Sequence, residues 1–429
     1  MIKEEPEAGV SVPSRLWSDG LPRWVGGRMF NSVMRAFAWL VGIAALLIAA
    51  GALPSSHPLP ILMCLMMVVP ATAIHEAGHA FAARRNGMRV IEIHVWLLNI
   101  LPLRRGLRWR FASPPKGVGG LVNAIPDPSR PLRPSMLWLM MGGPLANLAA
   151  ALACLPAALW GSSPWSNYAN AFLLINLGGF LANLVPFRGR HHASDGWQWL
   201  QWRHVWSEGV REVSVLALTS LSVWGVTAER IPGALLRQIE TLGQGGVLLA
   251  AWVRLKASQN VGDWAVVDEI DQAATETMAQ VTHAEKEGLK WILAWLQVES
   301  AFSRAVIQRD ARALLALPLG REMRWRAPHL PHRFAALACA LDGDRSACMA
   351  HLVRARAAAQ SSLDLALHES EDRIAGHIEA LLDATPDAGR GLSPASPSAD
   401  PSAPATPHAA PATASPRPAA AARSPSSRS

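Results

Sequence analysis

The sequence predicts a mainly α protein. We expect a polytopic transmembrane helix bundle of about four spans with a small β-hairpin or sheet in one cytoplasmic loop, then a helical cytoplasmic domain and a disordered tail. Three observations carry this prediction. Long apolar runs crowd the first half of the 429-residue chain, Arg residues gather between them, and the C-terminal stretch is mostly Pro, Ala and Ser. A stretch of that last composition has too little hydrophobicity to fold.

Four runs are apolar and long enough to cross a bilayer, which takes about 20 helical residues. They cover residues 36–53, 59–83, 136–160 and 168–187. The alternative is a large soluble protein with buried helices, but four runs of this length with almost no charge favour a membrane protein. A further stretch at 213–228 is short and rich in Ser and Thr, so we expect a soluble helix there rather than a fifth span.

Basic residues indicate how the spans are oriented. The loop between the second and third spans carries only Glu92 and Asp127 as acids. Its basic residues are Arg84, Arg85, Arg89, Arg104, Arg105, Arg108, Arg110, Lys116, Arg130 and Arg133. Cytoplasmic loops carry an excess of Lys and Arg, so we expect this loop and both termini in the cytoplasm of a multi-pass cell-membrane protein, most simply in a bacterial inner membrane. The net charge of +8 would suit nucleic acid in a soluble protein, but its placement beside apolar spans indicates membrane topology, and no nucleic-acid partner is expected.

The same loop has the pattern of β-strands. Residues 89–97 and 107–111 each place apolar side chains at every second position. Period-two alternation is typical of a half-buried strand. We therefore expect a β-hairpin or a small sheet in this loop.

Composition divides the chain into four parts. We expect an N-terminal cytoplasmic segment at 1–30, a transmembrane domain at 31–208, a helical cytoplasmic domain at 209–385 and a disordered Pro/Ala/Ser-rich tail at 386–429. Within the third part, two helices should meet at residues 342–344. None of the four cysteines forms a CxxC pair, so neither a disulfide framework nor a Cys-rich zinc site is indicated.

The second span contains the motif HEAGH near its end, at residues 75–79. On a helix, His75 and His79 lie one above the other on one face and can bind a single zinc ion, with Glu76 close enough to act on a water there. Ionisable residues inside a span are costly and usually functional. At 1.5 Å per residue, His79 lies roughly 9 Å from Arg85, where the span should end, so the site is expected near the cytoplasmic surface. The alternative is a polar cluster that only hydrogen-bonds between helices.

Further motifs follow this helix in a fixed order. They are GGPLAN at 142–147, NLVP at 183–186 and the pair Asp195-Gly196. Together with HEAGH at the end of a span, they resemble the site-2 protease family of intramembrane metalloproteases. The resemblance covers about residues 59–200.

The resemblance to site-2 proteases implies a Zn²⁺ cofactor and roles for particular residues. The zinc ligands would be His75, His79 and Asp195. The catalytic base would be Glu76, and the substrate-binding residues would include Asn147 and Asn183.

The third zinc ligand has an alternative. The segment between NLVP and Asp195 is longer than in the usual family pattern. It contains His192, whose imidazole could bind zinc equally well. Asp195 is expected to be the ligand, with His192 as the second candidate.

Two functions from different classes follow. The first is a zinc metalloendopeptidase that hydrolyses peptide bonds in or near transmembrane segments of membrane-protein substrates, as in regulated intramembrane proteolysis. Its partners would be the substrate, the lipid bilayer and a protein bound by residues 209–385, and residues 89–97 could receive an extended substrate by strand addition. The second is a catalytically silent member of the same family that acts as a membrane scaffold through residues 209–385.

Overall fold

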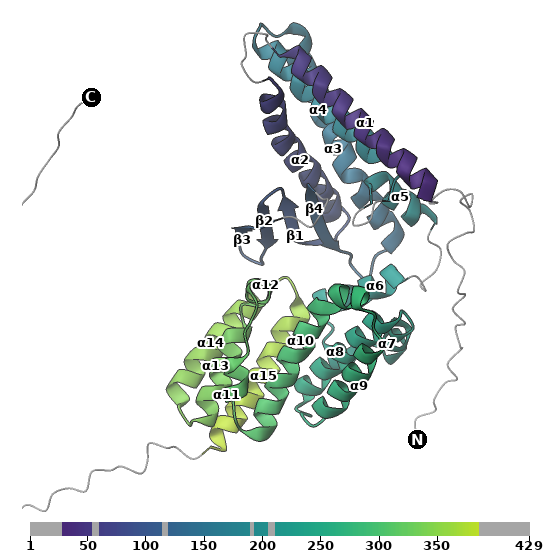
Figure 1. The fold of residues 1–429 in the computed structure, drawn as a ribbon. Helices are drawn as coiled ribbons and strands as arrows, with labels where there is room; N and C mark the ends of the chain where they lie inside the picture. The colour runs from purple at the N-terminus through teal and green to yellow at the C-terminus, as the bar shows by residue number, and fades with distance from the viewer. Residues whose placement is uncertain (1–27, 54–59, 114–118, 189–192, 205–210, 386–429) are drawn as a thin grey trace, which may run out of the picture. The chain divides into compact units, whose positions relative to one another are not determined.

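The computed structural model describes residues 28–53, 60–113, 119–188, 193–204 and 211–385 (Figure 1). The predicted tail and most of the predicted N-terminal segment lie outside these residues. The described part is mainly helical and contains one small antiparallel sheet. A mainly α fold with a small sheet is therefore confirmed.

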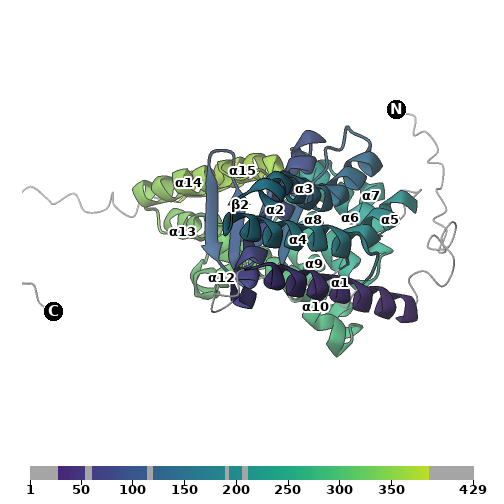
Figure 2. The same cartoon turned by 90° about the horizontal axis from the view of Figure 1, so that it is seen from above.

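Three of the described helices are long and apolar enough to cross a membrane: α1 (Arg28–Ala52), α2 (Pro60–Arg85) and α3 (Leu132–Trp160). The run predicted as a fourth span forms α4 (Trp165–Leu184), which packs against α1 and α3 (Figures 1 and 2). That α4 crosses the membrane stays a prediction. At 213–228, where a fifth span was not expected, α6 (Arg211–Val223) has 13 residues and is shorter than the about 20 needed to span.

Small residues let these helices approach one another closely. A Cβ atom added to Gly78 of α2 would overlap the carbonyl oxygen of Gly142 in α3. A Cβ on Gly178 of α4 would in the same way overlap the side chain of Ala45 in α1. Such contacts are typical of helices that associate in membranes, where small residues permit close backbone packing. Since Gly78 belongs to the HEAGH motif, this contact brings the motif into close packing with α3.

The loop between α2 and α3 forms the sheet. Its strands are β1 (Arg89–Val95), β2 (Leu98–Pro102), β3 (Leu107–Phe111) and β4 (Gly120–Ile125), in the antiparallel order β3-β2-β1-β4. The predicted strands are therefore present, although Trp96 and Leu97 form the turn between β1 and β2. The expectation that residues 89–97 could receive a substrate strand does not hold for residues 93–95, which are already paired on both sides, by β2 and β4.

The two faces of the sheet differ in polarity. Ile93 and Val122 lie opposite each other and pack on an apolar cluster built from α2 and α3. The other face is polar, with Glu92 paired to Asn123 and His94 paired to Asn99. A bulge between Val90 and Glu92 shifts the register, so that Val90 joins the apolar face while Glu92 lies on the polar one.

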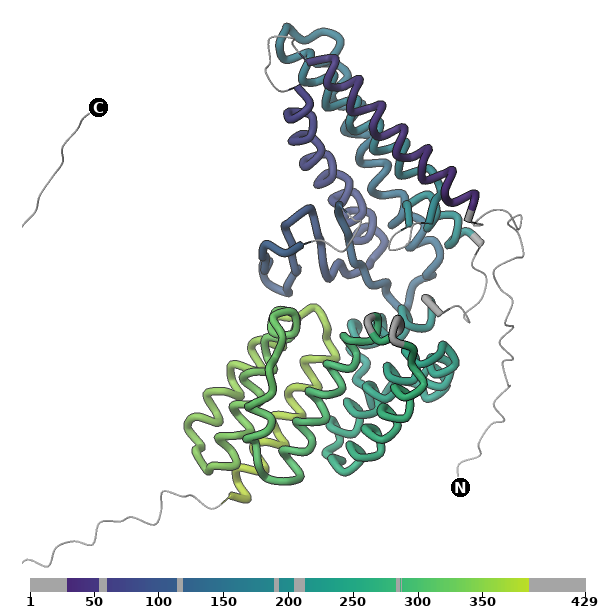
Figure 3. Tube along the Cα trace, viewed as in Figure 1, coloured from purple at the N-terminus to yellow at the C-terminus, as the bar shows by residue number. Residues whose placement is uncertain are grey.

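The remaining described chain is the helical region, α6–α15. After α6 it contains η1 (Ala228–Arg230), α7 (Gly233–Glu240), α8 (Gln244–Val261), α9 (Val267–Ala279), α10 (His283–Gln308), α11 (Arg312–Ala316), α12 (Arg321–Arg326), α13 (Leu330–Leu341), α14 (Arg345–Gln360) and α15 (Leu365–Asp383). Two apolar clusters hold it together, one around Leu248 and Ile292 and one around Phe302, Leu337 and Ile374. In the second, α13, α14 and α15 pack side by side (Figure 3).

The predicted helix pair around residues 342–344 is confirmed. α13 ends at Leu341 and α14 begins at Arg345. Gly343 takes a φ of 76°, which glycine adopts without steric cost. The Asp344 side chain accepts a hydrogen bond from the Ala347 backbone N–H at 2.9 Å and so caps α14.

A buried ion network lies inside the helical region. The Arg333 guanidinium, 1% exposed, donates to Glu371 Oε1 at 2.9 Å and to Glu299 Oε2 at 2.7 Å. Lys256 Nζ lies 3.3 Å from Glu299 Oε1. Burial raises the pKa of Glu299, but the charges of Arg333 and Lys256 outweigh it and lower the pKa to about 2. Glu299 is therefore charged at neutral pH and depends on its partners.

We expect Arg333→Leu to lower the stability of the helical region by about 3–5 kcal/mol, because it removes the buried guanidinium from Glu371 and leaves Lys256 as the cation beside Glu299. Trp fluorescence during chemical unfolding of the detergent-solubilised protein measures the shift. Arg345→Leu is the control, since it removes an ion pair with Asp383 whose side chains are 62% and 64% exposed and should cost at most about 1 kcal/mol. Equal shifts for the two variants would contradict this interpretation of the network.

Candidate metal centre

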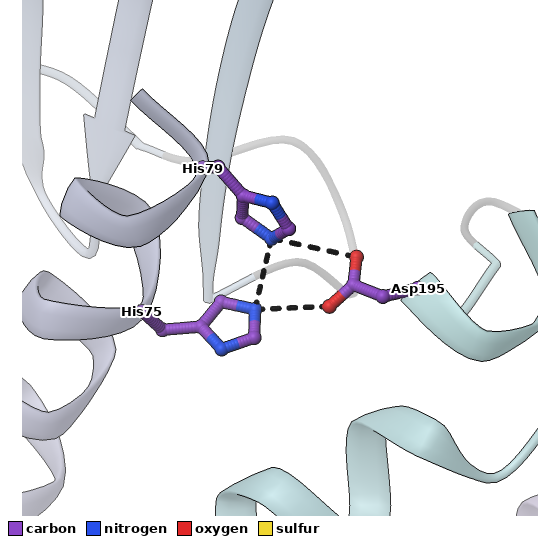
Figure 4. A group of neighbouring side chains, drawn as sticks. All are labelled: His75, His79 and Asp195. Atoms are coloured by element: carbon purple, nitrogen blue, oxygen red, sulfur yellow. Dashed lines mark hydrogen bonds and ion pairs between the residues drawn. The ribbon is translucent and has the colours of Figure 1, made fainter. Parts of the chain in front are cut away.

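The two histidines of HEAGH and Asp195 come from different helices. His75 and His79 lie one turn apart on α2, and Asp195 is the first residue of α5 (Asp195–His204). Figure 4 shows the three side chains pointing toward one another. Among the described residues they form a group of three metal-ligating side chains whose ligand atoms all lie within 4.8 Å of one another.

Local contacts explain why α5 begins at Asp195. The Ser194 hydroxyl accepts hydrogen bonds from the backbone N–H groups of Phe187 and Trp197, at 3.0 and 3.2 Å, and donates to the Val185 carbonyl at 2.7 Å. Ser194 thus caps the helix and ties its start to the end of α4. A Cβ on Gly196 would overlap the Leu184 carbonyl, so glycine is needed after Asp195 for α5 to reach this position.

The distances between ligand atoms fit a tetrahedral metal ion. His75 Nε2 lies 3.0 Å from Asp195 Oδ2 and 3.1 Å from His79 Nε2, and His79 Nε2 lies 3.5 Å from Asp195 Oδ1. With bonds of about 2.0–2.1 Å, tetrahedral zinc holds its ligand atoms about 3.3 Å apart. Two imidazole nitrogens and one carboxylate are also a donor set that zinc uses, and three protein ligands leave one position open.

Gly143 of α3 lies directly against the two imidazole nitrogens, with no side chain between them. A Cβ added there would lie 2.5 Å from His75 Nε2 and would overlap His79 Nε2 as well. Both distances are far shorter than van der Waals contact. The missing side chain therefore leaves free the space in front of the two nitrogens, where an ion would bind.

His79 is oriented by a backbone carbonyl. Its Nδ1 lies 2.6 Å from Leu139 O, closer than the 3.3 Å to the Gly143 backbone nitrogen, and because a carbonyl only accepts, the shorter contact favours the tautomer with the hydrogen on Nδ1. Nε2 is then the nitrogen with a lone pair, and it faces His75 and Asp195. A hydrogen bond of this kind fixes the tautomer and ring orientation of a metal-ligating histidine.

Glu76 is buried at the same end of α2, with 5% of its surface exposed. It lies against β4, because a Cβ on Gly120 would overlap its carboxylate. The start of β4 and the Glu76 carboxylate are thus in direct contact beside the two histidines.

The model of Peptidase family M50 matches residues 61–345, about two thirds of the chain. The chain belongs to peptidase family M50. This is the site-2 protease family, and its members are zinc-dependent proteases of membranes. The M50 match reaches beyond residues 59–200 into the helical region. Comparisons with curated proteins and with solved structures found no match.

The other two residues expected in the site lie on α3 and α4. Asn147 of α3 is 4% exposed, and its Oδ1 has no hydrogen-bond partner among the described residues. Its amide nitrogen lies beside Gly179 of α4, where a Cβ would be 2.6 Å away. Asn183 Nδ2 donates to the Gly179 carbonyl at 2.9 Å. Both asparagines therefore meet at Gly179, while His192 lies outside the described residues.

Three features of this candidate site were not predicted from the sequence. They are the close approach of Gly143 to the imidazoles, the carbonyl of Leu139 and the contact of Gly120 with Glu76. Gly143 belongs to the GGPLAN motif, so the sequence could have pointed to it as a site residue. Nothing in the sequence near Leu139 or Gly120 marks their contacts, which arise only when α3 and β4 pack on α2.

We expect Gly143→Ala to lower zinc affinity roughly 10–100-fold, as perturbing the residues that orient metal ligands does. The added methyl group would push both imidazoles out of position. Zinc content after dialysis of the purified protein measures the loss. Gly42→Ala on α1 is the matched control, because a Cβ there meets nothing within 4 Å. Equal zinc content in the two variants would contradict the inference that metal binding needs a residue without a side chain at position 143.

Proposed function

We propose that this M50 peptidase is a zinc metalloendopeptidase that hydrolyses peptide bonds in or next to transmembrane segments of membrane-protein substrates. One observation supports this most: His75, His79 and Asp195 converge on one point beside buried Glu76, on a helix apolar enough to span a membrane. A soluble peptidase would need an amphipathic metal-ligating helix, whereas residues 63–73 of α2 are apolar on nearly every side.

The proposed mechanism gives each residue one task. His75, His79 and Asp195 hold Zn²⁺, which when bound polarises the scissile carbonyl and acidifies the attacking water. Glu76 accepts the proton of that water and returns it to the leaving amine. The close contact of Gly120 with Glu76 keeps the carboxylate in place and excludes bulk water from one side.

We propose that the substrate is bound as an extended strand along β4. A transmembrane helix hides its carbonyls in internal hydrogen bonds, so it must unwind before attack. β4 lies at the edge of the sheet, and its first residue touches Glu76. An edge strand can pair with an added chain through its free backbone groups. The unpaired Oδ1 of Asn147 supports a role for Asn147, with Asn183 beside it, in binding this chain.

The proposal places the enzyme in the cell membrane with both termini and the sheet in the cytoplasm. This orientation rests on the basic loop between α2 and α3 and on the positive-inside rule. We retain the boundaries 1–30, 31–208, 209–385 and 386–429 as proposed domains, with 31–208 as the metalloprotease domain. The third domain is proposed to bind a protein partner.

Comparing membrane proteomes tests the function in cells. Cells that make the wild-type protein should accumulate fragments of membrane proteins cut in or near a transmembrane segment, and cells with Glu76→Gln should keep those proteins whole. Identical fragment patterns in both cells would refute the proposal. A wild-type protein purified without zinc would then favour the scaffold function.

A further inference from the structure

Helix α12 lies on the polar face of the sheet. The Trp325 ring contacts two guanidinium groups of β3, with Arg108 Cζ 4.3 Å and Arg110 Cζ 4.6 Å from the ring centroid. Its Nε1 donates to Asn99 Oδ1 at 3.0 Å, and Glu322 forms an ion pair with Arg110. One short helix of the helical region thus contacts two strands of the sheet through its side chains.

Glu92 of β1 is the centre of this contact. It is 5% exposed, and its Oε1 accepts from Arg326 of α12 at 2.9 Å and from Asn99 at 2.8 Å. Its Oε2 accepts from Asn123 of β4 at 2.9 Å. Burial raises the pKa of Glu92, but Arg326 and the two amides outweigh it and lower the pKa, so the carboxylate is charged. A buried carboxylate is stable only while it is paired.

This carboxylate connects α12 with the strand beside Glu76. Asn123 lies opposite Glu92 in the register of β1 and β4. β4 is at the edge of the sheet, and among the described strands it pairs with β1 alone. Side-chain contacts on its polar face therefore add to what holds it in place. Three residues before Asn123, Gly120 contacts Glu76. A shift at Asn123 would therefore be transmitted along a short strand to the catalytic base.

We propose that Arg326 and Trp325 are positioning residues: through Glu92 they hold β4 in place against Glu76. The helical region would thereby set the position of the substrate strand. This part of the inference rests on the proposed function, whereas the restraint on β4 does not. A partner that moved α12 would change substrate binding without touching the metal site.

Hydrogen–deuterium exchange of the full-length protein tests the restraint. Arg326→Gln removes a charge-assisted hydrogen bond, so the amides of β4 that pair with β1 should exchange about tenfold faster. Arg324→Gln, an exposed residue of the same helix, is the matched control and should leave exchange unchanged. Exchange in α13–α15 should stay as in the wild type, because the change is local. Equal exchange of β4 in Arg326→Gln and Arg324→Gln would overturn the inference, as would faster exchange throughout the helical region.

Kinetics with a membrane substrate test the consequence. Arg326→Gln should raise KM about tenfold and also lower kcat, because a loosened β4 no longer holds the Glu76 carboxylate, while zinc content stays unchanged since the metal ligands are untouched. Glu92→Gln should have at least as large an effect, and the double variant should be no worse than Glu92→Gln alone, because both variants remove the contact between Arg326 and Glu92. Additive effects of the two substitutions on KM would overturn the inference. An unchanged KM in a variant whose β4 amides exchange faster would overturn it as well. If the wild type cleaved no membrane protein, the proposed function would fail while exchange still decided whether α12 restrains β4.

Discussion

Asp195→Ala is expected to abolish stable zinc binding by the purified protein. Asp195 supplies the single carboxylate of the group and lies 3.0 Å from His75 Nε2 and 3.5 Å from His79 Nε2. Mutating partners of metal ligands already costs about 10–100-fold in affinity, and losing a ligand should cost more. Zinc per chain after dialysis against a weak chelator measures the effect. Asp268→Ala is the control, because that side chain is 82% exposed and far from the metal centre in sequence.

The same experiment decides between Asp195 and His192. If Asp195→Ala kept its zinc while His192→Ala lost it, the third ligand would be the histidine and the convergence of Asp195 on His75 and His79 would have another cause. The expected order is the reverse. Full zinc content in both variants would contradict a three-ligand site with either residue.

Glu76→Gln is expected to reduce cleavage by about 10²–10⁴-fold while zinc stays bound. Glutamine has nearly the same size as glutamate but cannot accept the proton of the attacking water. Glu76 is not among the three ligand residues, so the metal should be retained. Cleavage of a reconstituted membrane substrate and zinc content, measured on the same preparation, check both statements.

Two matched variants separate catalysis from metal binding. His75→Ala should lose zinc and cleavage together, whereas Glu76→Gln should lose only cleavage. Unchanged cleavage by Glu76→Gln would remove Glu76 as the base. Loss of zinc in Glu76→Gln would instead indicate that the carboxylate supports the metal site.

The motif HEAGH and the apolar run around it were enough to predict two metal-ligating histidines on a helix apolar enough to span a membrane. Helical spacing fixes which residues share a face, so His75 and His79 could be paired from sequence alone. Period-two alternation likewise predicted strands at 89–97 and 107–111, and the structure has strands at 89–95 and 107–111. These patterns are local, and local geometry determines them.

Contacts between distant elements could not be predicted in the same way. Alternation identified β1 as a strand but does not reveal strand order, so its central position and the edge position of β4 were not foreseen. Gly143 and Gly120 act through the absence of a side chain at a close approach. Such an approach is defined only once α3 and β4 have packed on α2.

Zinc K-edge X-ray absorption of the purified wild-type protein tests the central claim most directly. We predict about one zinc ion per chain, bound by two imidazole nitrogens and one carboxylate oxygen at about 2.0–2.2 Å, with a fourth light-atom ligand from solvent. The spectrum of Asp195→Ala should lack this signature. A wild-type protein that cleaves membrane substrates without zinc, or whose zinc has no imidazole ligands, would contradict the account.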